Sequence, residues 1–421
     1  MRRALVMSGG GSRGAYEMGA WQAFNELGVR FHAVYGTSIG AINAALFAQG
    51  DIQTALDLWE NINFSQLTGN DEAEFTIETM ISRKRDVIPF LIENAKHLQM
   101  DITPLEALLN AHLDEGAVRA SGMDLGVMTV RVPQIAAVPM RLRDMAPGSL
   151  ADWVIASASC FPVFPMRKIG ADRYVDGGYF DNMPIDMAIA DGADEIVAVD
   201  IHPQPTHPEY DRMPFLKMIH PLNNLGNFLD FNPRLLKRMR LMGYYDTMKA
   251  YGALDGIRYT FTRIGDVRVS PVARKFMSQV AKFDAETIRR TAFHSSQPMY
   301  APLISALEAD SPLRKLEWKE VWLRGIELAA QAMEFREDAI YDPCLLVERI
   351  LKFMDSGEKA PELNEKVITE AAHKGSRELL TILVRSLRDQ GAFSGDILRV
   401  LCEHPVETAA ALALHCSRTL Q

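Results

Sequence analysis

The sequence has little of what several classes of protein depend on. Only four of its 421 residues are cysteines, at positions 160, 344, 402 and 416, and no two of them form a CxxC pair. We therefore expect free thiols in a reducing compartment rather than a disulfide framework. The sequence also has no HExxH motif and no EF-hand loop. On this basis we expect neither a metal nor any other cofactor.

Positive charge and long apolar runs are scarce as well. Lysine and arginine number 45 against 54 aspartate and glutamate residues, which gives a net charge of -9. This balance argues against nucleic acid as a partner, because phosphate backbones require a basic surface. No run approaches the ~20 apolar residues of a membrane-spanning helix, and the run after Arg3 is too short for a signal peptide. We expect a cytoplasmic protein whose contact with membranes is at most peripheral.

What the chain does contain is enough apolar residue, 48%, for one large core and a smaller unit. Apolar runs and helical spacing alternate from the start, with strands expected at residues 4–8 and 31–35 and helices after each. This order predicts an α/β fold with helices layered on a sheet. Beyond about residue 300 only helical patterns occur, so we predict domains at 1–300 and 301–421.

The first expected strand runs into a glycine loop. Consecutive glycines let several N–H groups converge on one point, and a helix N-terminus follows, so the loop predicts an anion site. The anion is either a tetrahedral oxyanion or a phosphate, because Gly9, Gly11 and Gly14 also fit the GxGxxG dinucleotide pattern. A Rossmann-type protein needs an acidic residue at the end of the second strand, and Tyr35 and Gly36 stand there instead. We favour the oxyanion and keep a nucleotide-binding protein as the alternative.

The second expected strand runs into a GxSxG turn centred on Ser38. Small flanking residues let the chain fold back sharply between strand and helix, which exposes the serine hydroxyl for nucleophilic attack. The following helix would place its positive N-terminal dipole beside the serine. The two loops together favour acyl transfer at Ser38.

Three ordered blocks resemble the signature of the patatin-like phospholipase family, and segments at residues 158–162 and 243–249 resemble its bacterial branch. The three blocks are Gly9, Gly10, Gly11, Ser12, Arg13 and Gly14; Gly36, Thr37, Ser38, Ile39 and Gly40; and Asp176, Gly177 and Gly178. The resemblance implies a three-layer fold with a mostly parallel sheet. It also implies a catalytic dyad in which Ser38 attacks a fatty acyl ester of a lipid, such as a phospholipid, and Asp176 takes its proton. The N–H groups of Gly10 and Gly11 would hold the oxyanion, and Arg13 would steady the loop or meet the lipid phosphate.

Two alternatives to the dyad enzyme stay open. One is a serine–acid–histidine triad, for which His202, His207 and His220 follow Asp176 in the expected order. The other is a lipid-sensing protein that binds without catalysis. Residues 87–92 and 215–219 are apolar and could form a substrate entrance. The basic, amphipathic helix expected after Pro233 either lies at a lipid surface or packs on the core, and we favour packing.

Overall fold

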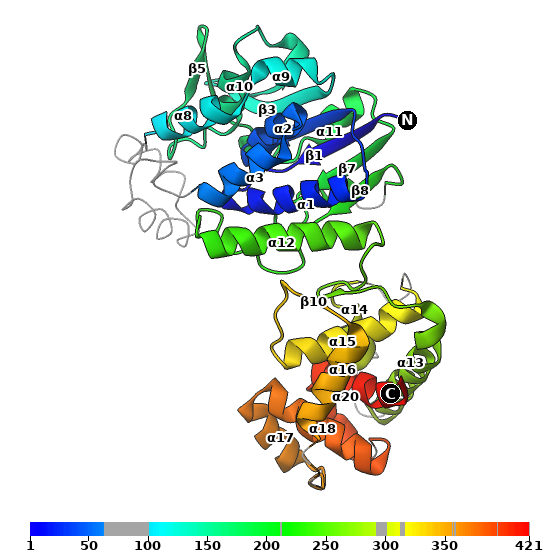
Figure 1. The fold of residues 1–421 in the computed structure, drawn as a ribbon. Helices are drawn as coiled ribbons and strands as arrows, with labels where there is room; N and C mark the ends of the chain where they lie inside the picture. The colour runs from blue at the N-terminus through cyan, green and yellow to red at the C-terminus, as the bar shows by residue number, and fades with distance from the viewer. Residues whose placement is uncertain are drawn as a thin grey trace. The chain divides into compact units, whose positions relative to one another are not determined.

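The computed structural model describes residues 1–62, 101–210, 213–291, 301–311, 316–355, 357, 359–393 and 395–420. The chain divides into two compact units, Met1–Ala250 and Tyr251–Gln421. The first unit is built on a central sheet and the second is mainly helical (Figure 1). Residues 87–92, expected near a substrate entrance, lie outside the described residues.

Eight strands of the described chain form the sheet of the first unit. Strands β3, β2, β1, β7 and β8 lie side by side and run parallel, while β4 and β6 pair antiparallel with β3, and β5 pairs antiparallel with β6. Their bounds are β1 (Arg3–Met7), β2 (Ala33–Thr37), β3 (Asp124–Val132), β4 (Ala136–Arg141), β5 (Arg167–Ile169), β6 (Asp172–Asp176), β7 (Glu195–Val199) and β8 (Leu216–Ile219). The central strands are continuous apolar runs because helices cover both faces of the sheet.

The long strand β3 determines where its neighbours end. Strand β4 pairs with residues 126–131 along one edge of β3. Strands β2 and β6 both overlap this stretch, so both must lie along the other edge. Thr37, the last residue of β2, lies opposite Met128, and Asp176, the last residue of β6, lies opposite Thr129. The two strands therefore meet end to end, with their carboxyl ends together.

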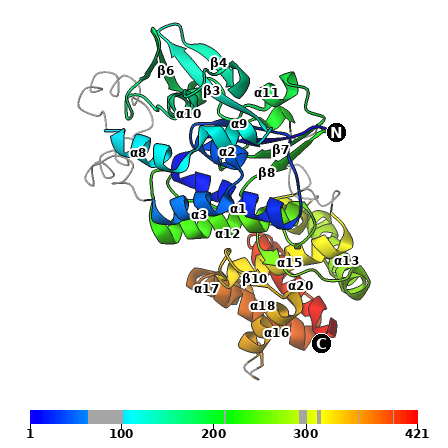
Figure 2. The same cartoon turned by 45° about the horizontal axis from the view of Figure 1, so that its top comes forward.

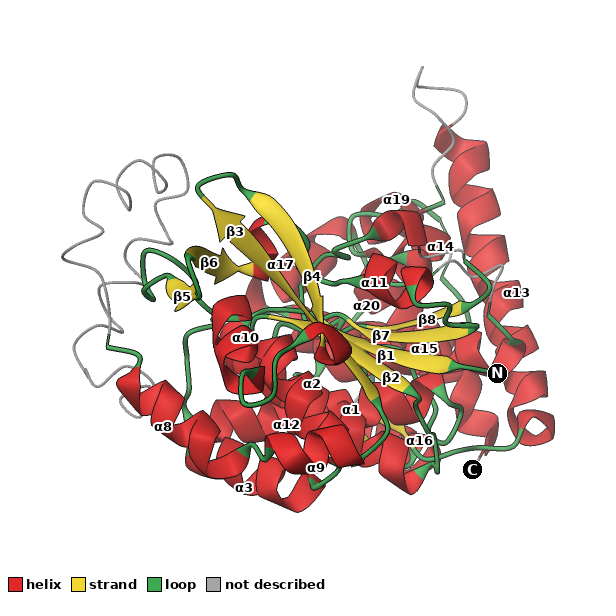
Figure 3. Ribbon diagram, turned by 90° about the horizontal axis from the view of Figure 1, so that it is seen from above, coloured by secondary structure: helices red, strands yellow, loops and turns green. Residues whose placement is uncertain are grey.

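Helices on the two faces complete a three-layer arrangement (Figure 3). One face carries α11 (Ile185–Ala190), whose Ile185 and Met187 pack against Ala4, Val6 and Tyr35. The bounds of the other helices of this unit are α1 (Gly14–Glu26), α2 (Ile39–Gln49), α3 (Ile52–Asn61), α8 (Thr103–His112), α9 (Glu115–Ala120), α10 (Leu150–Ser157) and α12 (Pro233–Ala250). Helices α1, α2 and α10 cover the opposite face, with α8 and α9 beside them (Figure 2). The predicted α/β fold with a mostly parallel sheet between helices is confirmed.

Helix α12 packs along α1 with the two backbones nearly touching. A Cβ atom on Gly243 would overlap the carbonyl oxygen of Tyr16, and one on Gly19 would overlap that of Arg240. Several apolar residues of α12, among them Leu236 and Met239, are buried, and α12 packs against α1. The packed alternative for this basic helix is therefore confirmed.

The second unit begins at Tyr251, before the boundary expected at residue 300. Its helices are α13 (Asp266–Thr291), α14 (Pro302–Glu308), α15 (Trp318–Ala332), α16 (Pro343–Met354), α17 (Glu365–Lys374), α18 (Ser376–Gln390), α19 (Ile397–Leu401) and α20 (Pro405–Ser417), and β9 (Thr260–Phe261) pairs in parallel with β10 (Ile340–Tyr341). Phe276 of α13 is fully buried in the same core as Trp322 of α15. The second unit starts earlier than expected because α13 belongs to its core, and no local sequence pattern in residues 251–300 predicts this packing.

Candidate active site

Ser38 occupies a strained turn between β2 and α2. Its backbone angles are φ 56 and ψ -125, a conformation that residues other than glycine rarely adopt. The turn is so tight that neither end has room for a side chain. A Cβ atom on Gly36 would overlap the carbonyl oxygen of Gly40, and one on Gly40 would lie 2.5 Å from the carbonyl oxygen of Met7. Glycine is therefore required at both ends of the GxSxG segment, and the serine stands at its apex.

The side chains of Ser38 and Asp176 meet across the junction of β2 and β6. The hydroxyl of Ser38 donates to Oδ2 of Asp176 over 2.7 Å, and the N–H of Gly178 donates to Oδ1 over 2.8 Å. The Asp176 side chain is buried, with 6% of its residue surface exposed. Burial raises the pKa of Asp176 from 3.8 to about 6, although the hydrogen bonds from Ser38 and Gly178 oppose the rise. The result is a carboxylate that is unusually basic and already in contact with a hydroxyl.

Two serines at the end of α10, which sequence reasoning missed, support both partners. The N–H of Ser38 donates to Oγ of Ser157 over 3.0 Å. The N–H of Asp176 donates to the carbonyl oxygen of Ser159 over 2.9 Å. Both serines are buried. No local pattern marks Ser157 for this role, because its contact reaches a residue 119 positions away. Ser159 lies in the segment 158–162 that resembles the bacterial branch, but its contact with Asp176 was not predicted.

The glycine loop lies directly beside Ser38. A Cβ atom on Gly9 would come within 3.0 Å of the Cβ of Ser38. Along the loop, the N–H of Gly9 donates to the carbonyl oxygen of Asn182, and that of Ser12 donates to the carbonyl oxygen of Phe228. By contrast, the N–H groups of Gly10 and Gly11 have no acceptor within the described part of the chain.

The polar side chains of the loop hold it to a neighbouring segment. The guanidinium of Arg13 donates through Nε and Nη2 to the carbonyl oxygen of Gly226, over 3.1 and 2.8 Å. The hydroxyl of Ser12 donates to the carbonyl oxygen of Asn227 over 3.1 Å. Of the two roles expected for Arg13, these contacts favour steadying the loop.

The remaining motif residues are contact points between the loops. A Cβ atom on Gly14 would lie 2.6 Å from the Ile39 side chain, so the two loops touch there. The hydroxyl of Thr37 donates to the carbonyl oxygen of Asp181 over 3.0 Å. Gly177 is buried, and a Cβ on it would overlap the carbonyl oxygen of Met128. The structure thus brings all three sequence blocks into one place.

Two of the three candidate histidines, His202 and His207, have other partners. His202 contacts Asp200 and Asn182, and His207 contacts Asp181 and Glu209. Among the residues that the structure describes, no histidine is hydrogen-bonded to the hydroxyl of Ser38 or to the carboxylate next to it. The geometry therefore favours a dyad over a triad.

The second apolar segment expected at a substrate entrance has a different place. Residues 216–219 form β8, which pairs in parallel with β7, and Phe215 and Met218 pack against the core of the sheet. This segment is a sheet strand, so its apolar character reflects packing. The apolar side chains exposed close to Asp176 are instead those of Tyr179 and Phe180, which are 54% and 63% exposed.

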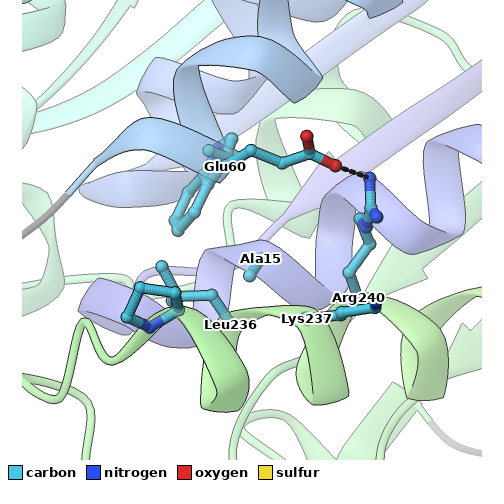
Figure 4. A pocket seen from close by; sticks show the side chains of 7 residues that line it. Ala15, Glu60, Leu236, Lys237 and Arg240 are labelled. Carbon is cyan, nitrogen blue, oxygen red and sulfur yellow. Dashed lines mark ion pairs between the residues drawn. The ribbon is translucent and has the colours of Figure 1, made fainter.

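A separate cavity of about 290 Å³ opens between α1, α3 and α12 (Figure 4). An ion pair of 3.0 Å between Glu60 and Arg240 crosses one side of it. Its lining consists of Ala15, Trp59, Glu60, Pro233, Leu236, Lys237 and Arg240. These residues include neither Ser38 nor Asp176, so the cavity is not the site described above.

Comparison with known proteins agrees with the geometry. Residues 5–189 match the family model described as patatin-like phospholipase. Over these residues the chain resembles a patatin-like phospholipase. The matched segment includes Ser38, Asp176 and the glycine loop, and it runs from β1 to α11 of the first unit.

The curated relatives match about half of this chain. Patatin-like phospholipase domain-containing protein 7 of Mus musculus is 29% identical over 207 residues, which cover 47% of this chain and 13% of that protein. Lysophospholipase NTE1 of Cryptococcus neoformans is 25% identical over 198 residues, which cover 47% of this chain and 11% of that protein. Among solved structures, VipD from Legionella pneumophila aligns with 99% of this chain and 89% of its own, at a TM-score of 0.40 and 16% identity. The matched segment therefore spans only a small part of these curated relatives.

In the described part of the chain, no helix combines the length and the apolar character needed to cross a membrane. No group of three His, Cys, Asp or Glu side chains in the same residues has the arrangement of metal ligands.

Proposed function

We propose that this protein is a serine acyl hydrolase that cleaves fatty acyl esters of lipids through Ser38 and Asp176. The observation that carries the proposal is the 2.7 Å hydrogen bond between the Ser38 hydroxyl and Oδ2 of the buried Asp176 carboxylate. A serine in a strained turn, a carboxylate in contact with it and unpaired backbone donors alongside are the parts that acyl transfer requires.

In the proposed reaction, Oγ of Ser38 attacks the ester carbonyl carbon and its proton passes to Oδ2 of Asp176. The carbonyl oxygen becomes an oxyanion, which the N–H groups of Gly10 and Gly11 stabilise. When the intermediate collapses, the leaving alcohol oxygen takes the proton from Asp176, and the acyl group stays on Ser38. Water then attacks the acyl-enzyme, with Asp176 as its base, and the fatty acid leaves as Ser38 regains its proton.

Asp176 has the basicity that this role needs. A carboxylate with an ordinary pKa is a weak base for a hydroxyl, and a general base works best when its pKa is close to the operating pH. Burial raises the pKa of Asp176 to about 6, so the group is still ionised at neutral pH but accepts a proton more readily. A second base such as histidine is not needed for the step.

The match to the patatin-like phospholipase family model and the surroundings of the dyad support a fatty acyl lipid as the substrate. Tyr179 and Phe180 follow Asp176 directly and expose apolar surface, and we infer that they contact acyl chains. One relative is named a lysophospholipase and another a patatin-like phospholipase domain-containing protein. A phospholipid or lysophospholipid is accordingly the substrate class to test first, with peripheral contact at a membrane surface.

A fluorophosphonate probe tests the proposal, because it reacts only with an activated serine. We expect covalent labelling of the wild-type protein, loss of labelling in Ser38→Ala, and full labelling in Ser121→Ala, which removes an exposed serine far from the site in sequence. Wild-type protein that stays unlabelled would contradict an enzyme. It would favour the lipid-sensing alternative, or, with measured nucleotide affinity, the Rossmann-type one.

The substrate class has its own test. Phosphatidylcholine vesicles, prepared without or with added lysophosphatidylcholine, should release free fatty acid when incubated with the wild-type protein, and the protein should float with them in a density gradient. Hydrolysis of short soluble esters without release from either vesicle would move the substrate to soluble acyl esters.

A further inference from the structure

A chain of hydrogen bonds runs beside the glycine loop without touching the Ser38–Asp176 pair. It begins at the Asp200 carboxylate, where Oδ1 lies 2.7 Å from Nδ1 of His202. Nε2 of the same ring lies 2.9 Å from Nδ2 of Asn182. That amide nitrogen also donates to the carbonyl oxygen of Gly9 over 3.3 Å. The chain therefore ends on the residue that precedes the two unpaired donors of the loop.

The carboxylate at the start of this chain is a fixed negative charge. Asp200 is fully buried, and burial alone would raise its pKa, but hydrogen bonds from His202 and Thr206 outweigh that effect and lower the pKa. Thr206 donates its N–H to Oδ2 over 2.7 Å and its hydroxyl to Oδ1 over 3.0 Å. A charged, fully bonded Asp200 holds the imidazole ring of His202 in one orientation.

The orientation of the ring determines that of the Asn182 amide. The Asp200 carboxylate only accepts, so the hydrogen of the singly protonated ring stands on Nδ1, and Nε2 accepts from the amide nitrogen of Asn182. The two hydrogens on Nδ2 of Asn182 are then used by His202 and by the carbonyl oxygen of Gly9. If the amide were turned over, its oxygen would face the Gly9 oxygen and that bond would be lost.

Gly9 is held from both sides by the same residue. Its N–H donates to the main-chain carbonyl oxygen of Asn182 over 3.0 Å, while its carbonyl oxygen accepts from the side chain. The Gly9 carbonyl and the Gly10 N–H belong to one planar trans peptide, in which the two groups point in opposite directions. A side chain that fixes the Gly9 oxygen therefore fixes the direction of the Gly10 N–H.

We propose that Asn182 is a positioning residue that aims the Gly10 N–H at the oxyanion, and that His202, anchored by Asp200, holds the Asn182 amide in the required orientation. The inference rests on the proposed hydrolase function. It assigns Asp200 and His202 a positioning role rather than one in proton transfer, since neither is hydrogen-bonded to Ser38.

Kinetics on a soluble p-nitrophenyl ester test the inference. Asn182→Ala should lower kcat about a hundredfold, the scale of a lost oxyanion donor, and change KM less than threefold. His202→Ala should lower kcat about tenfold. His202→Gln should recover most of that loss, because the amide of glutamine offers an oxygen acceptor close to the place of Nε2. His207→Ala is the matched control on the same loop, since His207 pairs with Asp181 and Glu209 and should leave kcat unchanged.

The double variant Asn182→Ala/His202→Ala separates positioning from folding. If His202 acts through Asn182, the double variant should be no slower than Asn182→Ala alone. An Asn182→Ala enzyme with kcat within twofold of wild type would overturn the inference, and so would equal rates for His202→Ala and His202→Gln. The last comparison stays decisive if Asn182→Ala fails to fold. These comparisons require wild-type protein that the fluorophosphonate probe labels at Ser38. Wild-type protein that is neither labelled nor active on the ester would overturn the proposed function, and this inference with it.

Discussion

The hydroxyl of Ser38 donates to Oδ2 of Asp176 over 2.7 Å, although 138 positions separate the two residues in the sequence. The other carboxylate oxygen is taken by the N–H of Gly178. One oxygen of Asp176 thus orients the group while the other faces the serine. An asparagine amide could therefore match the shape of the Asp176 carboxylate, but it could not act as the base.

We expect Asp176→Asn to keep the fold and lower kcat at least a thousandfold, because an amide cannot take the proton from Ser38. The measurement is ester hydrolysis beside a circular dichroism spectrum. Asp172→Asn is the matched control: it lies at the other end of the same strand, is exposed, and should leave kcat unchanged. An Asp176→Asn protein that turns over at a rate near wild type would remove Asp176 from the mechanism.

The activity should depend on pH through the same group. Since the pKa of Asp176 is raised to about 6, the reactive ionised form is lost as pH falls below that value. We expect kcat/KM to reach a plateau above pH 7 and to fall about tenfold per pH unit well below 6. A profile that stays flat down to pH 4 would mean that another group is the base.

The raised pKa of Asp176 also predicts that its ionised carboxylate lowers the free energy of unfolding at neutral pH. Between its ordinary value of 3.8 and the folded-state value of about 6, the folded protein keeps a proton that the unfolded chain has released. The free energy of unfolding therefore falls as pH rises through this window, by up to about 3 kcal/mol in total. Asp176→Asn lacks this loss, so urea unfolding should find it more stable than wild type at pH 7, with the difference shrinking towards pH 4. Equal stability at both pH values would refute the assignment.

Gly243→Ala should destabilise the first unit. The new Cβ would overlap the main-chain carbonyl oxygen of Tyr16, which cannot move without separating α12 from α1. We expect a loss of about 3 kcal/mol, measured as a lower Tm. Gly116→Ala is the comparison within the same unit, because its nearest neighbour is a side-chain oxygen of Asp114 at 3.1 Å. A Gly243→Ala protein as stable as that control would show that the helices separate without cost.

Treatment with EDTA should leave ester hydrolysis unchanged. The proposed reaction takes its base from Asp176 and its oxyanion donors from Gly10 and Gly11, so no step is assigned to a metal ion. The assay compares rates before and after chelation and after calcium is restored. Activity that disappears and returns with calcium would contradict this scheme.

Local sequence patterns predict much of the fold and two of the three parts of the site, the serine turn and the glycine loop. The GxSxG turn and the glycine loop could be placed because glycine spacing and flanking strands are short-range signals, and the structure puts Ser38 at φ 56 between a strand and a helix. Asp176 was found only through family resemblance, since an Asp-Gly turn is common.

The supporting residues could not be found from the sequence, because their roles come from contacts across the fold. Asn182 reaches back 173 positions to Gly9, and Ser157 reaches back 119 positions to Ser38. Sequence alone leaves residues 215–219 compatible with either a substrate entrance or core packing, because a buried sheet strand and an exposed apolar loop have the same composition. The pairing of β8 with β7 shows that the segment is a sheet strand, and strand pairing depends on residues distant in the sequence.

The meeting of β2 and β6 on one edge of β3 has a consequence for assembly. Side chains alternate between the faces of a sheet, so if β6 slid by one position along β3, the Asp176 carboxylate would turn to the far side. Hydrolysis would then stop in a molecule whose secondary structure was otherwise intact. Turnover in this protein should therefore report the alignment of a single short strand, and a preparation that is folded by spectroscopy but silent in the assay would point to that strand first.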